Sequence, residues 1–98
     1  MFVKIIKSYR VIVAVCDSEL IGKKFEEGKF QLDVKESFYK GEIVSEEKLI
    51  EILEDMIRED ATFNIVGEKS VSAALKSGIV NEEGIKKIHG IPFALRLL

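Results

Sequence analysis

The 98-residue chain has no tryptophan, one cysteine, one proline and no serine/glycine-rich or glutamine/asparagine-rich tract. Disordered and low-complexity classes are therefore excluded, since 47% of the residues are hydrophobic and can form a core. The one cysteine, Cys16, cannot form an internal disulfide, which fits a reducing compartment. The longest apolar run, Val11 to Cys16, is too short to span a membrane, and Met1 to Lys4 leads into a strand-like pattern, not a signal peptide. We expect a cytoplasmic protein whose residues 1–98 form a single compact domain.

Charge of neither sign dominates, because fifteen basic residues stand against seventeen acidic ones and the formal net charge is −2. The whole molecule therefore exerts no general attraction on nucleic acid or anionic lipid, and such a partner needs a local basic patch. A long helix expected after Ser45 could segregate negative charge and leave a basic side elsewhere. Its acidic residues are Glu46, Glu47, Glu51, Glu54, Asp55, Glu59 and Asp60. Twelve lysines beside two asparagines and one glutamine are typical of a heat-adapted protein.

The first half of the chain reads mainly as strands. Residues 2–6 and 10–16 predict an antiparallel hairpin, and the unbroken apolar run of its second strand favours a central place in the sheet. A charged loop over 23–29 leads to a strand over 30–34 with Phe30, Leu32 and Val34 facing inward. Residues 38–41 predict a turn in which Gly41 takes a positive φ.

Two helices and a second hairpin follow. Ser45 is expected to cap a helix with apolar residues at helical spacing, and a strand over 61–66 leads through Gly67 into a helix that ends at Gly78. Residues 85–88 and 91–98 predict a hairpin that turns at His89-Gly90 and has Ile91, Phe93, Leu95 and Leu97 facing inward. Pro92 places that strand at an edge or a bulge. The fold class is α+β, with a mixed, mostly antiparallel sheet, N-terminal and C-terminal hairpins and two main helices.

The strand-to-helix turn from Asn64 to Lys69 is the first candidate site. Free amides at Gly67, Glu68 and Lys69 could receive an anion, because a helix N-terminus carries a partial positive charge. The glycine spacings of a P-loop and of a dinucleotide-binding turn are both absent. Glu68 itself could occupy the positive end, and Asn64 could either hold the loop or face a ligand.

Cys16 and Asp17, at the exit of the expected central strand, are the second candidate site. A reactive thiolate needs a cation or a helix N-terminus nearby, whereas Asp17 opposes ionisation of its neighbour. His89, the one histidine, offers the one possible cysteine-histidine pairing, and no spacing brings the two together. We expect Cys16 to be an inert core residue and Asp17 a cap. The ligand spacings of metal sites are missing, and neither metal nor cofactor is predicted.

A local basic surface is the third candidate. It would bind RNA through its lysines, with Tyr39 or Phe38 stacking on an unpaired base and His89 standing beside the lysines. The alternative is a solvated face on which lysines are scattered among glutamates. The lysines of the candidate surface are Lys23, Lys24, Lys86 and Lys87.

Several of these stretches together resemble a known family. They are Ala14-Val15-Cys16-Asp17, Leu20 with Gly22-Lys23, Phe38-Tyr39-Lys40-Gly41, Asn64 to Lys69, and His89 to Ala94. The chain is similar, over essentially its whole length, to the archaeal domain-of-unknown-function family 424. The resemblance implies an archaeal cytosolic protein near the translation apparatus, because the family's genes tend to lie beside translation-initiation and ribosome-maturation genes. It implies no reaction. Positions that match the family pattern and carry chemical groups are Cys16, Asp17, Lys23, Tyr39, Asn64, Glu68 and His89.

Two functions from different classes are expected. The leading hypothesis is a non-enzymatic binding module that docks on RNA or on a ribosomal or translation-factor protein. The alternative is a small-molecule or phosphate-binding enzyme with its site at the turn from Asn64 to Lys69. A homodimer formed through an edge strand near Phe93 to Leu98 is a third arrangement.

Overall fold

The structure, a computed structural model, describes residues 1–97. The strands are β1 (Phe2–Lys7), β2 (Val11–Cys16), β3 (Lys24–Glu27), β4 (Phe30–Asp33), β5 (Glu42–Ile43), β6 (Thr62–Val66), β7 (Ile85–Ile88) and β8 (Ile91–Arg96). The α-helices are α1 (Glu36–Tyr39), α2 (Glu46–Ile57) and α3 (Glu68–Ser77), and 3-10 turns cover Ser18–Leu20 and Glu82–Gly84. None of the helices among residues 1–97 is long and apolar enough to cross a membrane.

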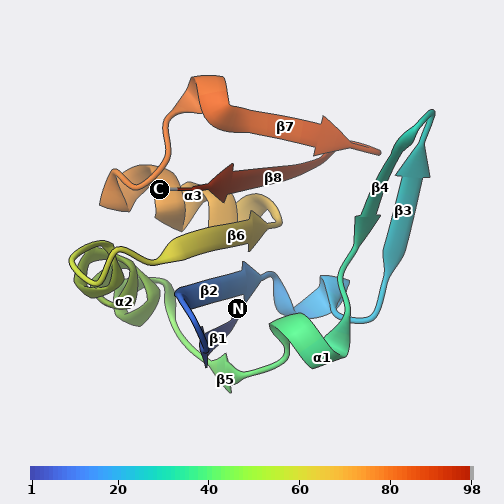
Figure 1. The fold of residues 1–98 in the computed structure, drawn as a ribbon. Helices are drawn as coiled ribbons and strands as arrows, with labels where there is room; N and C mark the ends of the chain where they lie inside the picture. The colour runs from blue at the N-terminus through green and yellow to red at the C-terminus, as the bar shows by residue number, and fades with distance from the viewer. Residues whose placement is uncertain (98) are drawn as a thin grey trace.

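Six strands form the main sheet in the order β5-β1-β2-β6-β8-β7, and β3 and β4 form a separate two-stranded sheet (Figure 1). The pair β2 and β6 is parallel, and the other neighbours are antiparallel. The predicted α+β class, with a mixed, mostly antiparallel sheet and a hairpin near each end, is therefore confirmed. The central place predicted for the strand over 10–16 is confirmed as well, because β2 lies between β1 and β6.

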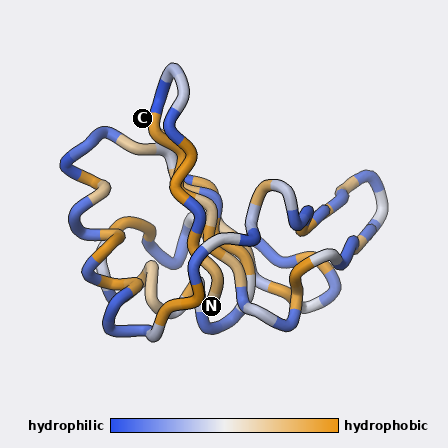
Figure 2. The backbone as a smooth tube through the Cα atoms, turned by 90° about the horizontal axis from the view of Figure 1, so that it is seen from below, coloured by the Kyte–Doolittle hydropathy of each residue, from blue (hydrophilic) through white to orange (hydrophobic). Residues whose placement is uncertain are grey.

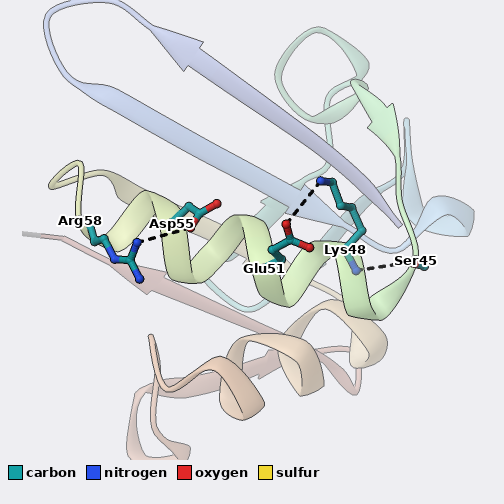
Figure 3. Close-up of polar contacts among 5 residues, drawn as sticks. All are labelled: Ser45, Lys48, Glu51, Asp55 and Arg58. Carbon is teal, nitrogen blue, oxygen red and sulfur yellow. Dashed lines mark hydrogen bonds and ion pairs between the residues drawn. The ribbon is translucent and has the colours of Figure 1, made fainter.

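α2 and α3 cover one face of the main sheet, which we call the helix face. α2 begins where Ser45 Oγ accepts a hydrogen bond from the Lys48 amide at 3.2 Å, as the sequence predicts. Leu49 and Leu53, one turn apart, are fully buried against sheet residues such as Val13 and Phe63. On the exposed side of α2, Lys48 lies 3.8 Å from Glu51, and Arg58 lies 3.8 Å from Asp55 (Figure 3). Figure 2, in which the backbone is coloured by residue hydropathy, shows hydrophobic residues gathered along the central strands.

The second face of the main sheet is only partly covered. Near the ends of β2 and β6, Cys16 and Val66 pack in one cluster with Leu32, Val34 and Tyr39, which belong to β4, α1 and the segment between them. The β3–β4 hairpin stands apart from the main sheet, on the other side of the molecule from α2 (Figure 1). The remaining part, which we call the open face, stays partly accessible. Its residues are Ile12, Thr62, Asn64, Phe93 and Leu95, which the register places on this face.

Three expectations about strands were wrong. Residues 24–27 form β3 instead of a loop, because pairing with β4 supplies the backbone hydrogen bonds. The charged side chains hide the alternation of polar and apolar residues by which a strand is predicted. Phe30, expected inward, is 70% exposed near the turn of that hairpin. In β8 the inward phase is shifted: Pro92 and Ala94 are buried, whereas Leu95 and Leu97 are 55% and 65% exposed.

β8 is also an interior strand, between β6 and β7, but its pairing with β7 ends at Ala94, so the homodimer expected near Phe93 to Leu98 stays a prediction; Leu98 lies outside the described residues. Pro92 is tolerated without a bulge because it lies just past the last β6–β8 pair, Val66 with Phe93. Its carbonyl accepts a hydrogen bond from the Gly67 amide at 2.8 Å, so the missing amide proton faces the end of β6.

Gly41 does not have the positive φ that the sequence suggested. Its role is close approach: a Cβ at this position would lie 2.2 Å from the Val3 carbonyl oxygen and 2.9 Å from the Lys4 Cα. Only a residue without a side chain lets the chain enter β5 so close to β1.

Candidate functional site

The carboxyl ends of β2 and β6 lie side by side. These strands are parallel, and Cys16 is the register partner of Val66, so Asp17 and Gly67 become neighbours although fifty residues separate them. The Asp17 amide continues the pairing by donating to the Val66 carbonyl at 3.1 Å. The ends of central parallel strands are where open sheets commonly hold ligands.

The carboxylate of Asp17 occupies the N-terminus of α3. Its Oδ2 accepts a hydrogen bond from the Lys69 amide at 3.1 Å, and its Oδ1 accepts from the amide and hydroxyl of Ser70 at 2.8 and 2.7 Å. These are the amides that an N-cap side chain normally satisfies, and the N-cap residue here, Gly67, has no side chain. Asp17, at the end of β2, therefore caps α3, and its side chain is buried, with 3% of the residue exposed. Glu68, the residue expected to fill this position, is exposed instead.

Gly67 makes that arrangement possible. Its φ of +107° with ψ of 156° is a conformation that residues with a side chain rarely adopt. A Cβ on Gly67 would also lie 2.3 Å from the Asp17 carboxyl carbon. Gly67, which suggested a phosphate-binding turn in the sequence, is therefore needed because the Asp17 carboxylate occupies the space of a side chain at this position.

A depression of about 180 Å³ lies beside this junction. Asp17, Gly67, Glu68 and Lys69 line it, as the sequence grouped them, together with Glu19 and the turn at Gly90. Three of these side chains are carboxylates and one is an ammonium group. Because the Asp17 oxygens already hold the helix amides, the depression offers an anion little positive charge.

Cys16 is buried, and its thiol is not ionised at physiological pH. Burial, with a smaller contribution from the charge of Asp17, raises the pKa of its thiol to about 11. The residue therefore stays a neutral thiol at physiological pH, as expected of a core cysteine. Across residues 1–97, no group of three or more histidine, cysteine, aspartate or glutamate side chains is placed to hold a metal ion.

Asn64 belongs to a second pocket, of about 190 Å³, on the open face; we call it the Asn64 pocket. It shares no lining residue with the junction, so the structure separates Asn64 from Glu68 and Lys69. Within the described chain, neither the Asn64 amide group nor the Tyr39 hydroxyl makes a hydrogen bond to another residue. The pocket is lined by Leu32, Tyr39, Asn64, Ile65, Val66, Phe93, Ala94 and Leu95.

Tyr39 is one wall of this pocket and not a stacking platform. It is 7% exposed, and burial, followed by the nearby Cys16 and Asp33, raises the pKa of its hydroxyl to about 12. The ring is therefore not free to stack on a base, contrary to the role considered for it. Phe93 is half-buried and lines the same pocket. Sequence patterning missed Phe93 as a site residue because it assigned the whole inward phase of its strand to the core.

The candidate lysines are distributed over two faces. Lys86 is the register partner of Phe93, and its side chain therefore projects from the same face as the Asn64 pocket. Lys87 pairs with Pro92 and projects from the helix face. Lys23 and Lys24, at the start of β3, are exposed, and Lys24 lies 4.0 Å from Glu26.

His89 is a turn residue. It has a φ of +52°, and its amide donates to Glu27 Oε1 at 3.2 Å, while its ring contacts the Glu26 carbonyl oxygen. It therefore ties the tip of the β7–β8 hairpin to β3.

Negative charge is concentrated in one layer. Residues 46–60, which comprise α2 and the turn after it, contain seven of the seventeen acidic residues and two of the fifteen basic ones. The rest of the chain therefore has more basic than acidic residues. The acidic helix lies on the side of the sheet away from the open face, whereas Lys86 and Lys87 project from opposite faces, so the basic side of this expectation stays a prediction.

Comparisons with known proteins agree with the resemblance read from the sequence. A solved structure of an uncharacterized conserved protein from Methanopyrus kandleri superposes with a TM-score of 0.86 and 22% sequence identity, over 96% of this chain and 87% of that chain. At that identity, the likeness shows a shared fold. Among curated proteins, none matches the chain. The family model described as "Protein of unknown function (DUF424)" matches residues 6–97, and the chain therefore belongs to that family.

Proposed function

We propose that the protein is a non-catalytic RNA-binding module of the cytoplasmic translation apparatus, and that its open face is the binding surface. The observation that carries the proposal is the Asn64 pocket, where an amide and a hydroxyl without protein partners lie beside the half-buried ring of Phe93. The association with translation and the archaeal source come from the family resemblance alone.

The distribution of charge supports RNA on this face. The acid-rich segment 46–60 lies in the helix layer, so the phosphate backbone of an RNA on the open face would avoid it. Lys86 projects from the same face as the pocket and makes no ion pair among the described residues. One or a few phosphate contacts of this kind predict weak, salt-dependent binding.

The chemistry of the remaining candidates favours binding over catalysis. A nucleophile or a general base needs an accessible reactive group, whereas Cys16 is a buried neutral thiol and Asp17 is committed to three hydrogen bonds. His89 is held at a hairpin tip by contacts with β3.

The test is sedimentation of native extract through a sucrose gradient at low and high salt, followed by detection of the protein. Co-migration with a ribosomal subunit that high salt abolishes is the expected result. The variant Lys86→Gln should weaken it, whereas the matched control Lys48→Gln, on the acidic helix, should not. Migration of the wild type as a free small protein at both salt concentrations, together with no affinity for structured RNA at low salt, would contradict the proposal.

The alternative function, a small-molecule or phosphate-binding enzyme at the turn from Asn64 to Lys69, is favoured by the 180 Å³ depression at the junction. It has less support because Asp17 fills the helix N-terminus and Asn64 opens elsewhere. Thermal denaturation with and without inorganic phosphate distinguishes the two functions, since a ligand of the junction raises the melting temperature.

A further inference from the structure

We propose that the Asn64 pocket binds one unpaired RNA base, with the Asn64 amide group hydrogen-bonded to the edge of the base and Phe93 against its face. This inference rests on the proposed function and makes it specific. It assigns sequence preference to a single pocket and leaves affinity to the lysines around it.

The size of the pocket selects the occupant. At about 190 Å³ it is smaller than the roughly 300–1,000 Å³ of pockets that take drug-sized molecules. A single planar ring system fits such a volume. Leu32 and Leu95 give the walls an apolar surface, which suits the faces of a base.

The Asn64 amide group supplies hydrogen bonds of both kinds. Its neighbours in register are Ala14 and Leu95, neither of which competes for its donor or its acceptor. A side-chain amide matches the edge of a base that presents one donor and one acceptor, as asparagine does with adenine.

Phe93 and Lys86 complete the site. The two residues are register partners on one face, so the ring that would stack on a base lies directly beside an ammonium group that would meet the adjoining phosphate. Unpaired bases in RNA are commonly bound in this way, by an aromatic face and hydrogen bonds to the edge. Tyr39 also lines the pocket, and its raised pKa keeps its hydroxyl protonated at physiological pH.

The experiment measures fluorescence anisotropy of labelled eight-nucleotide RNAs, each containing a single base type, at low salt. The full chain is compared with the variants Asn64→Leu, which keeps volume but removes hydrogen bonds, and Phe93→Leu, which removes the ring. Lys48→Gln, on α2 and away from the open face, is the matched control. All variants are first checked for an unchanged thermal transition.

We expect the wild type to prefer one base type and Asn64→Leu to remove that preference, with a loss of about 5- to 150-fold for the preferred RNA. Phe93→Leu should weaken all RNAs by a similar factor, because stacking does not depend on the base. Lys48→Gln should bind like the wild type.

Two results overturn the inference, and they differ in what they leave standing. If Lys86→Gln weakens binding while Asn64→Leu and Phe93→Leu do not, RNA is held by its backbone; the base pocket is then wrong and the proposed function stands. If the wild type binds none of the RNAs and no structured RNA, both proposals fail together.

Discussion

Replacing Asp17 with alanine should destabilise the protein by about 3–5 kcal/mol, the cost typical of removing one partner from a buried charged interaction. The magnitude follows from the contacts of the carboxylate. Each of its three hydrogen bonds, from the Lys69 amide and from the Ser70 amide and hydroxyl, is charge-assisted, and such bonds contribute about 1.5–3 kcal/mol singly. They are not additive, because water can reach the partly buried Lys69 amide once the carboxylate is gone. The Ser70 amide is buried and would remain unsatisfied.

Urea unfolding followed by circular dichroism measures the effect, with an unchanged slope showing that the two-state comparison holds. Asp17→Asn keeps one acceptor oxygen for the Ser70 donors and should cost less, about 1–2 kcal/mol, because it loses the charge at the helix N-terminus and the acceptor for the Lys69 amide. Ser45→Ala, at the exposed cap of α2, is the reference and should cost about 1 kcal/mol. If Asp17→Ala costs no more than Ser45→Ala, the carboxylate is not the buried cap that its geometry indicates.

Three further predictions concern single residues. Gly67→Ala should cost about 1–3 kcal/mol from its positive φ alone. In urea unfolding, the double variant with Asp17→Ala should lose less stability than the sum of the two single losses, because each substitution disrupts the same helix cap. Full additivity would refute this coupling. Gly41→Ala should cost about 1–3 kcal/mol, because its Cβ meets the Val3 carbonyl; hydrogen exchange should show faster exchange at β5, and unchanged rates there would contradict the close approach. Burial raises the pKa of the Cys16 thiol from 9.0 to about 11 in the folded state. The free energy of unfolding should therefore be unaffected by this thiol below pH 9 and fall by up to about 2–3 kcal/mol as the pH rises to 11, because the unfolded chain releases the proton first. Cys16→Ala should flatten this fall, and an equal fall in both proteins would disprove the assignment.

The sequence predicted elements whose signals are local. Ser45 with the two glutamates after it indicated the start of α2, and His89-Gly90 between apolar runs indicated the C-terminal hairpin; both are present. Each rests on capping or turn chemistry that a few adjacent residues supply.

The errors have non-local causes. β3 has charged residues on both faces and exists because β4 pairs with it, so no periodicity could reveal it. Leu95 was assigned to the core because exposed leucines and buried ones look alike in an alternating strand, and only the packing of the helices decides which face is covered. Likewise, the sequence placed Asp17 and Gly67 at the ends of their strands. It could not show that Asp17 caps α3, the helix that follows Gly67, because this contact depends on the parallel pairing of β2 with β6.

That parallel pair also has a consequence for the way the chain reaches its fold. β5, β1 and β2 all come from residues 2–43, and β6, β8 and β7 all come from residues 62–96, so the main sheet consists of two halves that are contiguous in sequence. Within each half the hairpins close short loops, whereas joining the halves brings together residues such as Ile12 and Thr62, at a greater loss of chain entropy. We therefore expect docking of the halves to be the slow step of folding, because this pairing is remote in sequence. Asp17 reaches across this seam to donors 52 and 53 residues away. We therefore expect its hydrogen bonds to form after docking and to act mainly by slowing unfolding.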